Sequence, residues 1–263
     1  MAVIRYAKEA LRFIAAMSPF ILFALIYNSM RYYPNYLVND IDTEGVYTLE
    51  KYLFGIWSEG VQLTPCEYFR LHHWAVADVL SGLFYLCWVP LPIIYSIYLY
   101  FTGHRRLSLR LSSAFLLVNL IGFCGYYIYP ASPPWYVMQY GFTPVLDTPG
   151  NVAGFVHFDS NVGFPLFHSI YSGNANVFAA IPSLHAAYCP IALFYALKVK
   201  HNTGWTLVLS VVSVGIWWAA VYSGHHYIID VLLGILTTII GLAIFEGIIV
   251  KRFPRRWLNW LRG

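Results

Sequence analysis

The chain has 263 residues, of which 59% are hydrophobic, 19% are aromatic and only 11% are charged. Soluble domains carry about 25% charged residues and 45–50% apolar ones, so this composition cannot cover a surface that faces water. The sequence therefore excludes an ordinary soluble domain and predicts an integral membrane protein. Its four scattered cysteines match neither a disulfide framework nor a CxxC metal site.

A helix that crosses a bilayer needs about 20 mostly apolar residues, and six stretches of the chain meet this requirement. The first is too long for a typical signal peptide, and no small-x-small cleavage site follows it. We therefore predict an all-α integral membrane protein, a single domain of six transmembrane helices over residues 1–263. The predicted spans are roughly 10–30, 79–101, 109–129, 183–198, 204–222 and 227–250.

Positive charge is distributed unevenly between the two sides of this arrangement. Thirteen of the 16 Lys and Arg residues fall on the side that holds both termini, and only Arg31, Lys51 and Arg70 fall on the opposite, outer side. Because the sides rich in Lys and Arg stay in the cytoplasm, both termini are predicted to be cytoplasmic. The stretch Lys251–Arg262 is typical of a cytoplasmic anchor on anionic lipid.

Two long outer loops, residues 31–78 and 130–182, are left on the other side. The first contains amphipathic stretches around Leu49–Trp57, which indicate an interfacial helix with aromatic residues at the level of the headgroups. The second is rich in Gly, Pro and Asn. Loops of this length are usually functional, so we expect both to lie near an active site.

The outer end of the sixth span reads Tyr222-Ser-Gly-His-His-Tyr-Ile-Ile-Asp230. His226 and Asp230 are four residues apart, so on a helix they share one face. A carboxylate there accepts a hydrogen bond from one imidazole nitrogen and leaves the other nitrogen as a nucleophile. The alternative is an interfacial polar cluster. It does not account for a carboxylate at a helix entry, which costs free energy unless it is paired or hydrated.

The outer end of the fourth span reads Asn176-Val-Phe-Ala-Ala-Ile-Pro-Ser-Leu-His185. Pro182 suits the first turn of a helix, and Ser183 would lie near free backbone N–H groups, which attract phosphate. His185 can reach the same anion. Taken alone, this motif is explained slightly better by a Pro–Ser cap with a buried histidine.

The outer end of the third span, Tyr126-Tyr-Ile-Tyr-Pro-Ala-Ser-Pro-Pro-Trp-Tyr136, is a rigid and aromatic exit from the membrane. Taken alone, it is better explained as an aromatic belt. The functional alternative is one wall of a lipid-headgroup site, to which Tyr129 and Trp135 would contribute.

All three motifs fall on the same outer side under an orientation derived only from Lys and Arg. This combination suits phosphoryl transfer through a covalent phosphohistidine. His226 would attack phosphorus, Asp230 would orient it, and His185 would protonate the leaving oxygen and then deprotonate the acceptor. Such chemistry needs no ion, so we expect no metal and no cofactor. A nucleic-acid partner is not expected either, because the basic residues lie along a membrane.

The Pro-Ser-Leu-His at 182–185 and the His-x-x-x-Asp at 226–230 resemble the second and third signatures of the type 2 phosphatidic acid phosphatase (PAP2) superfamily. The resemblance covers most of the chain and implies that family's helical core of six spans. In the family, residues that match His185, His226 and Asp230 form the catalytic triad. The residues expected to bind substrate are Arg70, Asp78, Tyr129, Trp135, Asn176, Pro182, Ser183 and His225.

The closer resemblance is to the inositolphosphotransferase branch, which includes fungal inositol phosphorylceramide synthase and is related to sphingomyelin synthases. It rests on the segments 129–136, 176–185 and 225–230. That branch moves a phospho-headgroup from a phospholipid to a ceramide-type lipid alcohol and releases diacylglycerol. We therefore expect a lipid phosphotransferase whose best candidate donor is phosphatidylinositol. The sequence indicates no obligatory protein partner.

The chain departs from the ordinary phosphatases of that superfamily in its cations. It lacks their Lys-x6-Arg-Pro signature, and Ala220 stands where they have an Arg, six residues before the nucleophilic His. A phosphomonoester carries close to two negative charges near neutral pH, whereas a diester carries one. A site with fewer cations therefore favours a diester donor and transfer over hydrolysis, unless Arg70 or a protonated His225 compensates.

Two other functions stay open at this point. A PAP2-type lipid phosphate phosphatase would share the phosphohistidine and resolve it with water. A transporter would be supported by Gly/Pro breaks inside paired spans, which the sequence does not show. The active side would be the periplasm in a bacterium or the Golgi lumen in a eukaryote. The absence of long extensions favours a bacterial inner membrane.

Several other outer residues are weaker candidates. His72 and His73 need no special role as interfacial residues. Asp78 opens the second span, where an acidic residue suggests function, although a helix cap explains it equally well. The second outer loop also offers groups that could bind sugar hydroxyls, with no basis for choosing among Asp147, His157, Asp159, Asn161 and His168.

Overall fold

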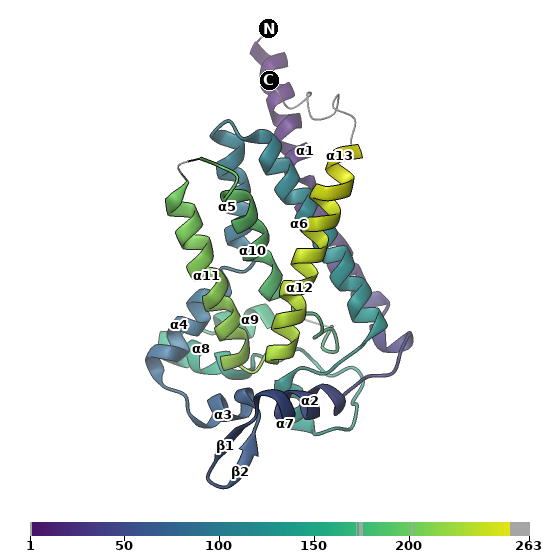
Figure 1. The fold of residues 1–263 in the computed structure, drawn as a ribbon, viewed down its shortest axis with the longest axis vertical. Coiled ribbons are helices and arrows are strands. Elements are labelled where there is room, and N and C mark those ends of the chain that lie inside the picture. The colour runs from purple at the N-terminus through teal and green to yellow at the C-terminus, as the bar shows by residue number, and fades with distance from the viewer. Residues whose placement is uncertain (1, 172, 174–175, 201, 253–263) are drawn as a thin grey trace.

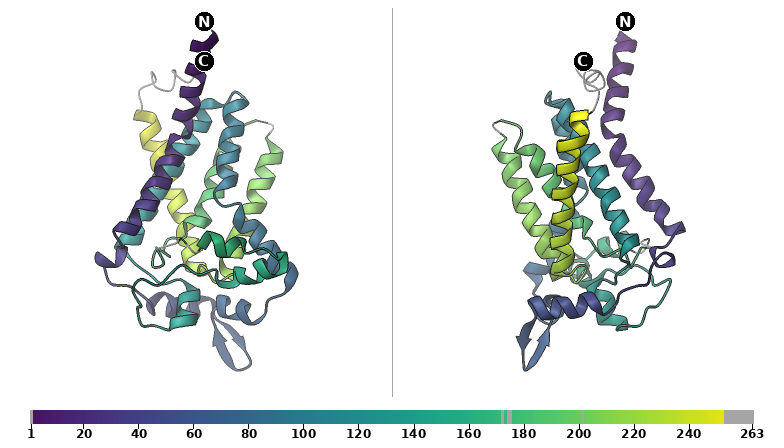
Figure 2. Two further views of the ribbon diagram at one scale, coloured as in Figure 1. Left: turned by 180° about the vertical axis from the view of Figure 1, so that it is seen from behind. Right: turned by 45° about the vertical axis from the view of Figure 1, so that its right-hand side comes forward.

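The computed structural model describes residues 2–171, 173, 176–200 and 202–252. Its long helices run between two ends of the molecule (Figure 1). The amino-terminal end of α1 (Ala2–Ser29) and α13 (Val250–Arg252) lie at one end. The short helices α2 (Gly45–Phe54), α3 (Pro65–Leu71) and α7 (Pro134–Tyr140) lie at the opposite end, as all views show (Figures 1 and 2).

Within the described residues, four helical segments are long and apolar enough to cross a membrane. They are Tyr6–Tyr32 around α1, α6 (Arg105–Ile128), α11 (Thr203–Tyr222) and the continuous segment Ile228–Arg252. The last comprises α12 (Ile228–Ile244), the π-helical turn η4 (Phe245–Ile249) and α13. A fifth candidate is the pair α4 (Ala75–Leu86) and α5 (Pro90–Phe101), which is bent by 46°. The chain is a multi-pass membrane protein with four or five candidate spans by length and composition.

The bend in the predicted second span has a local cause. Pro90 is the first residue of α5 and Pro92 follows two residues later. A proline has no backbone N–H to donate and its ring clashes with the carbonyl four residues earlier, so α4 cannot continue through this point. The residues of the break include Trp88, which packs against the site described below.

The predicted fourth span is where the structure departs most from expectation. The helix α10 (Leu184–Ala196) has only 13 residues. At 1.5 Å per residue it rises about 20 Å, less than the ~30 Å hydrocarbon core of a bilayer. It packs against α5, α6, α11 and α12, and most of its side chains are buried. Its apolar character therefore reflects contact with other helices rather than with lipid.

Small residues let the neighbouring helices approach the start of α10 closely. A Cβ atom added to Gly234 of α12 would lie 2.1 Å from the backbone oxygen of Ser183, and one added to Gly122 of α6 would lie 2.5 Å from Leu184. Glycines at helix contacts allow such backbone approach. The start of α10 is thus held tightly between α6 and α12.

The two outer segments contain short elements rather than unstructured loops. A backbone connection joins them, in which Asp42 N donates to Pro130 O at 2.8 Å and Ser132 N donates to Asp42 O at 2.9 Å. The predicted interfacial helix is present as α2, but Trp57 lies beyond it in a β-hairpin. The remaining elements are η1 (Met30–Tyr32), η2 (Asn35–Leu37), β1 (Ile56–Ser58), β2 (Val61–Leu63), η3 (Ala153–Phe155), α8 (Val156–Val162) and α9 (Leu166–Tyr171).

At the end that holds α13, basic residues from two predicted cytoplasmic clusters converge on one acid. Glu246 accepts hydrogen bonds from Arg110, from Lys198 at 2.9 Å and from the hydroxyl of Tyr195 at 2.7 Å. Of the predicted lipid anchor at 251–262, only residues 251 and 252 lie within the described residues; Trp257 and Trp260 do not.

Candidate active site

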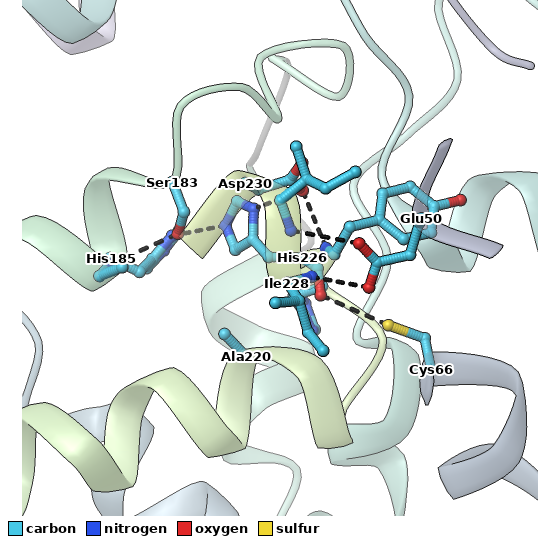
Figure 3. Close-up of polar contacts among 12 residues, drawn as sticks. Glu50, Cys66, Ser183, His185, Ala220, His226, Ile228 and Asp230 are labelled. Atoms are coloured by element: carbon cyan, nitrogen blue, oxygen red, sulfur yellow. Dashed lines mark hydrogen bonds and ion pairs between the residues drawn. The ribbon is translucent and has the colours of Figure 1, made fainter. Parts of the chain in front are cut away.

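Two histidines and a carboxylate form a continuous chain of contacts, with His185 on α10, His226 in the turn before α12 and Asp230 on α12 (Figure 3). His226 Nδ1 lies 3.3 Å from Asp230 Oδ2, and His226 Nε2 lies 3.0 Å from His185 Nδ1. His226 is 5% exposed and Asp230 is fully buried. The spacing of four residues therefore brings His226 and Asp230 together as expected, and His185 joins them from α10.

The turn that carries His226 is fixed by backbone hydrogen bonds. Gly224 has φ +74, which lets the chain reverse between α11 and α12. The N–H groups of His225 and His226 both donate to Ala220 O at 3.0 Å. Trp135 N donates to Gly224 O at 2.9 Å, so the second outer segment also holds the turn. The imidazole of His226 is thus presented by a rigid backbone.

The start of α12 is capped twice. Asp230 Oδ2 accepts a hydrogen bond from Tyr227 N at 2.9 Å. Glu50 of α2 accepts from Ile228 N at 2.9 Å and from Ile229 N at 3.2 Å, which are helix-start donors without partners inside the helix. Glu50 is fully buried, and this burial raises the pKa of its carboxyl to about 7. The sequence analysis missed Glu50, because its place in an amphipathic stretch is typical of a solvated helix face.

A second contact ties the first outer segment to the same turn. Cys66, at the start of α3, donates from Sγ to the backbone oxygen of His226 at 3.4 Å (Figure 3). Burial raises the pKa of the Cys66 thiol well above its ordinary value, so it stays protonated and can donate. No motif in the sequence pointed to this residue.

The histidines line a small cavity of about 70 Å³, here called the histidine cavity. About half of its other lining residues are aromatic, and these walls come from α1, the α4–α5 break, α6, α10 and the second outer segment. The rings of Trp88 and Tyr85 pack against His185, with centroids 4.2 Å and 4.9 Å away. No Lys or Arg within the described part of the chain lines this cavity. The shortage of cations inferred from the sequence therefore holds for the cavity itself.

His225 also lines the histidine cavity, and its Nδ1 lies 3.1 Å from Ser223 Oγ. Its Nε2 is buried, and no hydrogen-bond partner for it is seen within the described residues. Burial lowers the pKa of His225 to about 3, so its ring is neutral in this structure. It does not replace a missing cation here, although a neutral ring can still offer one N–H donor.

Ser183 and Pro182 support the site without lining it. Ser183 is the N-cap of α10; its Oγ accepts from Ala186 N at 3.4 Å, and its own N–H donates to Asp230 O at 3.0 Å. Pro182, predicted to lie in the first turn of the helix, instead lies one residue before the N-cap and is buried against Gly125. The first residues of α10, Leu184 and His185, do border the histidine cavity. The cap expected from this motif and the placement of its histidine beside His226 are both present.

The other expected substrate residues divide into three groups. Trp135 and Asn176 line the histidine cavity. Arg70 and Asp78 instead line a neighbouring cavity, described below. Tyr129 lines neither of these two cavities; it is 45% exposed and donates its hydroxyl to Asp42.

Ala220, which stands where the phosphatases have an arginine, lies inside the protein. Ala220 is fully buried on α11, and its carbonyl holds the turn that carries the histidines. A guanidinium at this point would be enclosed by protein.

Comparison with known families matches residues 46–244 to the PAP2 superfamily. The chain belongs to this superfamily. It is 56% identical over 236 residues to a phosphoinositol dihydroceramide synthase of Bacteroides thetaiotaomicron, which covers 90% of this chain and 77% of that protein. The PAP2 resemblance predicted from the two signatures is thereby confirmed.

More distant relatives of this PAP2 protein are fungal. An inositol phosphorylceramide synthase of Candida albicans is 26% identical over 68% of this chain, and the catalytic subunit of that enzyme from Saccharomyces cerevisiae is 30% identical over 49%. The chain spans only 38% and 31% of the length of these two proteins. No solved structure matches the chain.

Proposed function

We propose that this protein transfers a phosphoinositol group from phosphatidylinositol to the primary hydroxyl of a ceramide-type lipid and releases diacylglycerol. The observation that carries the proposal is the His185–His226–Asp230 chain beside a cavity that no Lys or Arg of the described residues lines, in a protein 56% identical to a phosphoinositol dihydroceramide synthase. A singly charged diester needs less positive charge than a phosphomonoester.

The distances between the rings support one assignment of the protons. With Asp230 accepting from His226 Nδ1–H, the Nε2 atom of His226 keeps a lone pair, so the proton between the two rings lies on His185 Nδ1. His226 Nε2 attacks phosphorus, and the bond from phosphorus to the diacylglycerol oxygen breaks. His185 enters this step as an imidazolium, a form favoured by the bound phosphodiester anion, and gives its Nδ1 proton to that leaving oxygen, which leaves a neutral ring.

The second half of the reaction restores both rings. His185 Nδ1, now a base, takes the proton of the acceptor hydroxyl, and the acceptor oxygen attacks phosphorus. The bond from phosphorus to His226 Nε2 breaks and inositol phosphorylceramide leaves. At 3.0 Å the two ring nitrogens leave no room for phosphorus between them, so the donor phosphate must replace their direct hydrogen bond.

The proposal includes a topology of six membrane crossings, with α10 as a short fourth crossing enclosed by the others. Irregular backbone at membrane depth is tolerated where protein encloses it, as it does before Ser183. Both termini would be cytoplasmic and the histidine cavity would open on the non-cytoplasmic face. The Lys and Arg distribution supports this orientation.

The test is a two-substrate assay on the purified protein in mixed micelles. One reaction contains phosphatidylinositol with a fluorescent ceramide, the other contains phosphatidic acid, and each is repeated with His226→Ala. Inositol phosphorylceramide formed by the wild type alone is the expected result. Phosphate release from phosphatidic acid with no ceramide product would replace the transferase with a lipid phosphate phosphatase.

A further inference from the structure

A second cavity of about 240 Å³ lies beside the histidine cavity and is more than three times as large. We call it the polar cavity, and its polar lining groups include Arg70, His73, Asp78, Gln139, Asn151 and His157. Ser223 and Gly224 form part of its wall, whereas the next two residues of the same turn line the histidine cavity. The turn that carries the histidines therefore separates the two spaces.

The two cavities meet at two shared side chains, Trp135 and Asn151. Both are held in place by the second outer segment and the turn. Asn151 Nδ2 donates to Gln139 Oε1 at 3.0 Å, and Trp135 N donates to Gly224 O. The two cavities are therefore adjacent at these side chains, and a donor with its phosphorus at His226 would enter the polar cavity there.

Acceptors and donors converge at the far side of the polar cavity around a buried acid. Asp78 is 2% exposed, accepts from the Tyr222 hydroxyl at 2.7 Å and from Asn161 Nδ2 at 3.4 Å, and lies 3.2 Å from His73 Nδ1. Asp78 does not cap α4, because Trp74 occupies the cap position and no side-chain cap is present. The capping explanation of Asp78 therefore fails, and its carboxylate is instead part of this polar cluster.

Two further groups of the lining retain hydrogen-bonding capacity. The ring of His157 stacks on that of His73, with centroids 3.8 Å apart, and no hydrogen bond from its ring is seen among the described residues. Arg70 is exposed and makes one long hydrogen bond, 3.4 Å from Nη1 to Met138 O, although a guanidinium has five N–H donors. Burial and the neighbouring His73 lower the pKa of His157.

We propose that the polar cavity binds the polyol ring of the donor headgroup, with Arg70 and His157 making direct hydrogen bonds to ring hydroxyls. This inference rests on the proposed function. A hydroxyl both donates and accepts, so a ring with several hydroxyls matches a lining of guanidinium, imidazole, amide and carboxylate groups. A choline headgroup would be repelled by Arg70, and its recognition calls for an aromatic cage instead.

A divalent cation is the competing occupant of the same cluster. The candidate ligand atoms of His73, Asp78 and His157 lie within 4.8 Å of one another. Two observations favour the polyol. Both carboxylate oxygens of Asp78 already have protein partners, and the planes of the two imidazoles are only 18° from parallel. Stacked rings direct their in-plane lone pairs side by side rather than toward a common point.

The test measures headgroup binding without turnover. The full-length protein is purified in detergent as the His226→Ala variant, and glycerophosphoinositol is titrated by calorimetry with and without EDTA. Added to that background, His157→Phe keeps the stacked ring and removes its nitrogens, and Arg70→Gln removes the guanidinium. Each is expected to weaken glycerophosphoinositol binding about tenfold, the loss of one or two hydrogen bonds to ligand, with binding of glycerol 3-phosphate unchanged.

The matched control is His168→Phe, because His168 is exposed on α9 and lines neither cavity. Glycerophosphoinositol affinity that is unchanged in both His157→Phe and Arg70→Gln, or that EDTA abolishes, would overturn the inference.

In parallel, the lipid assay is run with the single variants in the wild-type background. A wild type that makes no inositol phosphorylceramide would overturn the proposed function. Product formation with an unaltered KM for phosphatidylinositol in both variants would overturn only the polyol site.

Discussion

Glu50 accepts a hydrogen bond from the backbone N–H of Ile228 at 2.9 Å, across 178 residues of sequence. The bond connects α2 of the first outer segment to the first residue of α12, two positions after His226. The Cys66 thiol also donates a hydrogen bond to the His226 carbonyl. The first outer segment therefore contacts the histidine turn through two residues, Glu50 and Cys66. We infer that Glu50 and Cys66 position the nucleophile without touching the substrate.

Replacing Glu50 by Gln tests this positioning role. The amide has one acceptor oxygen, so either Ile228 N or Ile229 N loses its partner, and an unsatisfied buried donor costs about 1–3 kcal/mol. We expect kcat to fall about tenfold with little change in KM, because the substrate contacts stay intact. The matched control is Glu44→Gln, an exposed acid just before the same helix, which should behave like the wild type. A variant at Glu50 with unchanged kcat would contradict the prediction.

The same carboxyl predicts a pH dependence of stability. Burial raises the pKa of Glu50 from 4.5 to about 7, with Asp230 adding to the rise. Between these values the native protein holds a proton that the unfolded chain has lost, so stability is highest below the lower value and falls as pH rises toward the higher one. Thermal unfolding in detergent should show a larger drop in Tm between about pH 5 and about pH 8 for the wild type than for Glu50→Gln. Equal drops would contradict the assignment.

A trapped intermediate separates the roles of the two paired histidines. With phosphatidylinositol labelled in its inositol ring, a single turnover without ceramide should leave label on the wild-type protein. His226→Ala should carry none, because it lacks the attacking nitrogen. His185→Gln should acquire label about 10²–10⁴ times more slowly, the usual contribution of a general acid. Label on the His226→Ala protein would show that another residue is the nucleophile.

Contacts that are local in sequence were predictable, and those between distant segments were not. The pairing of His226 with Asp230 follows from their spacing, and Ser183 caps α10 as its place after a proline suggests. Glu50 and Cys66 reach the same turn from more than 150 residues away. Nothing in the local sequence distinguishes Glu50 from an acid on a solvated helix face, and nothing there indicates that Cys66 contacts the turn.

Hydropathy predicted the long lipid-facing helices better than the enclosed one. Five of the six predicted spans correspond to elements that meet the length and composition of a crossing, counting the bent pair α4–α5 as one. The apolar stretch at 183–198 gives a shorter helix because its side chains contact other helices on nearly all sides. An apolar stretch has the same hydropathy whether other helices or lipid surround it, so hydropathy alone does not separate the two cases.

Restoring the arginine of the phosphatases at Ala220 should damage this protein rather than convert it. Ala220 is fully buried, and its carbonyl accepts the N–H groups of both histidines in the turn. Burying a charge without a partner costs several kcal/mol. We expect Ala220→Arg to lower Tm by at least several degrees and to release no phosphate from phosphatidic acid, whereas Ala220→Ser stays close to the wild type. A stable Ala220→Arg protein with phosphatase activity would show that the missing cation alone sets the reaction.

The proposed orientation can be tested by labelling single cysteines from one side of the membrane. Trp57 is 73% exposed in the hairpin of the first outer segment, and His104 is exposed in the turn between α5 and α6. With Cys87 and Cys124 replaced by Ser, a membrane-impermeant maleimide added to intact cells should label Trp57→Cys and not His104→Cys. Lysed cells should label both, which controls for reactivity. Labelling of His104→Cys in intact cells would reverse the orientation and place the histidine cavity on the cytoplasmic side.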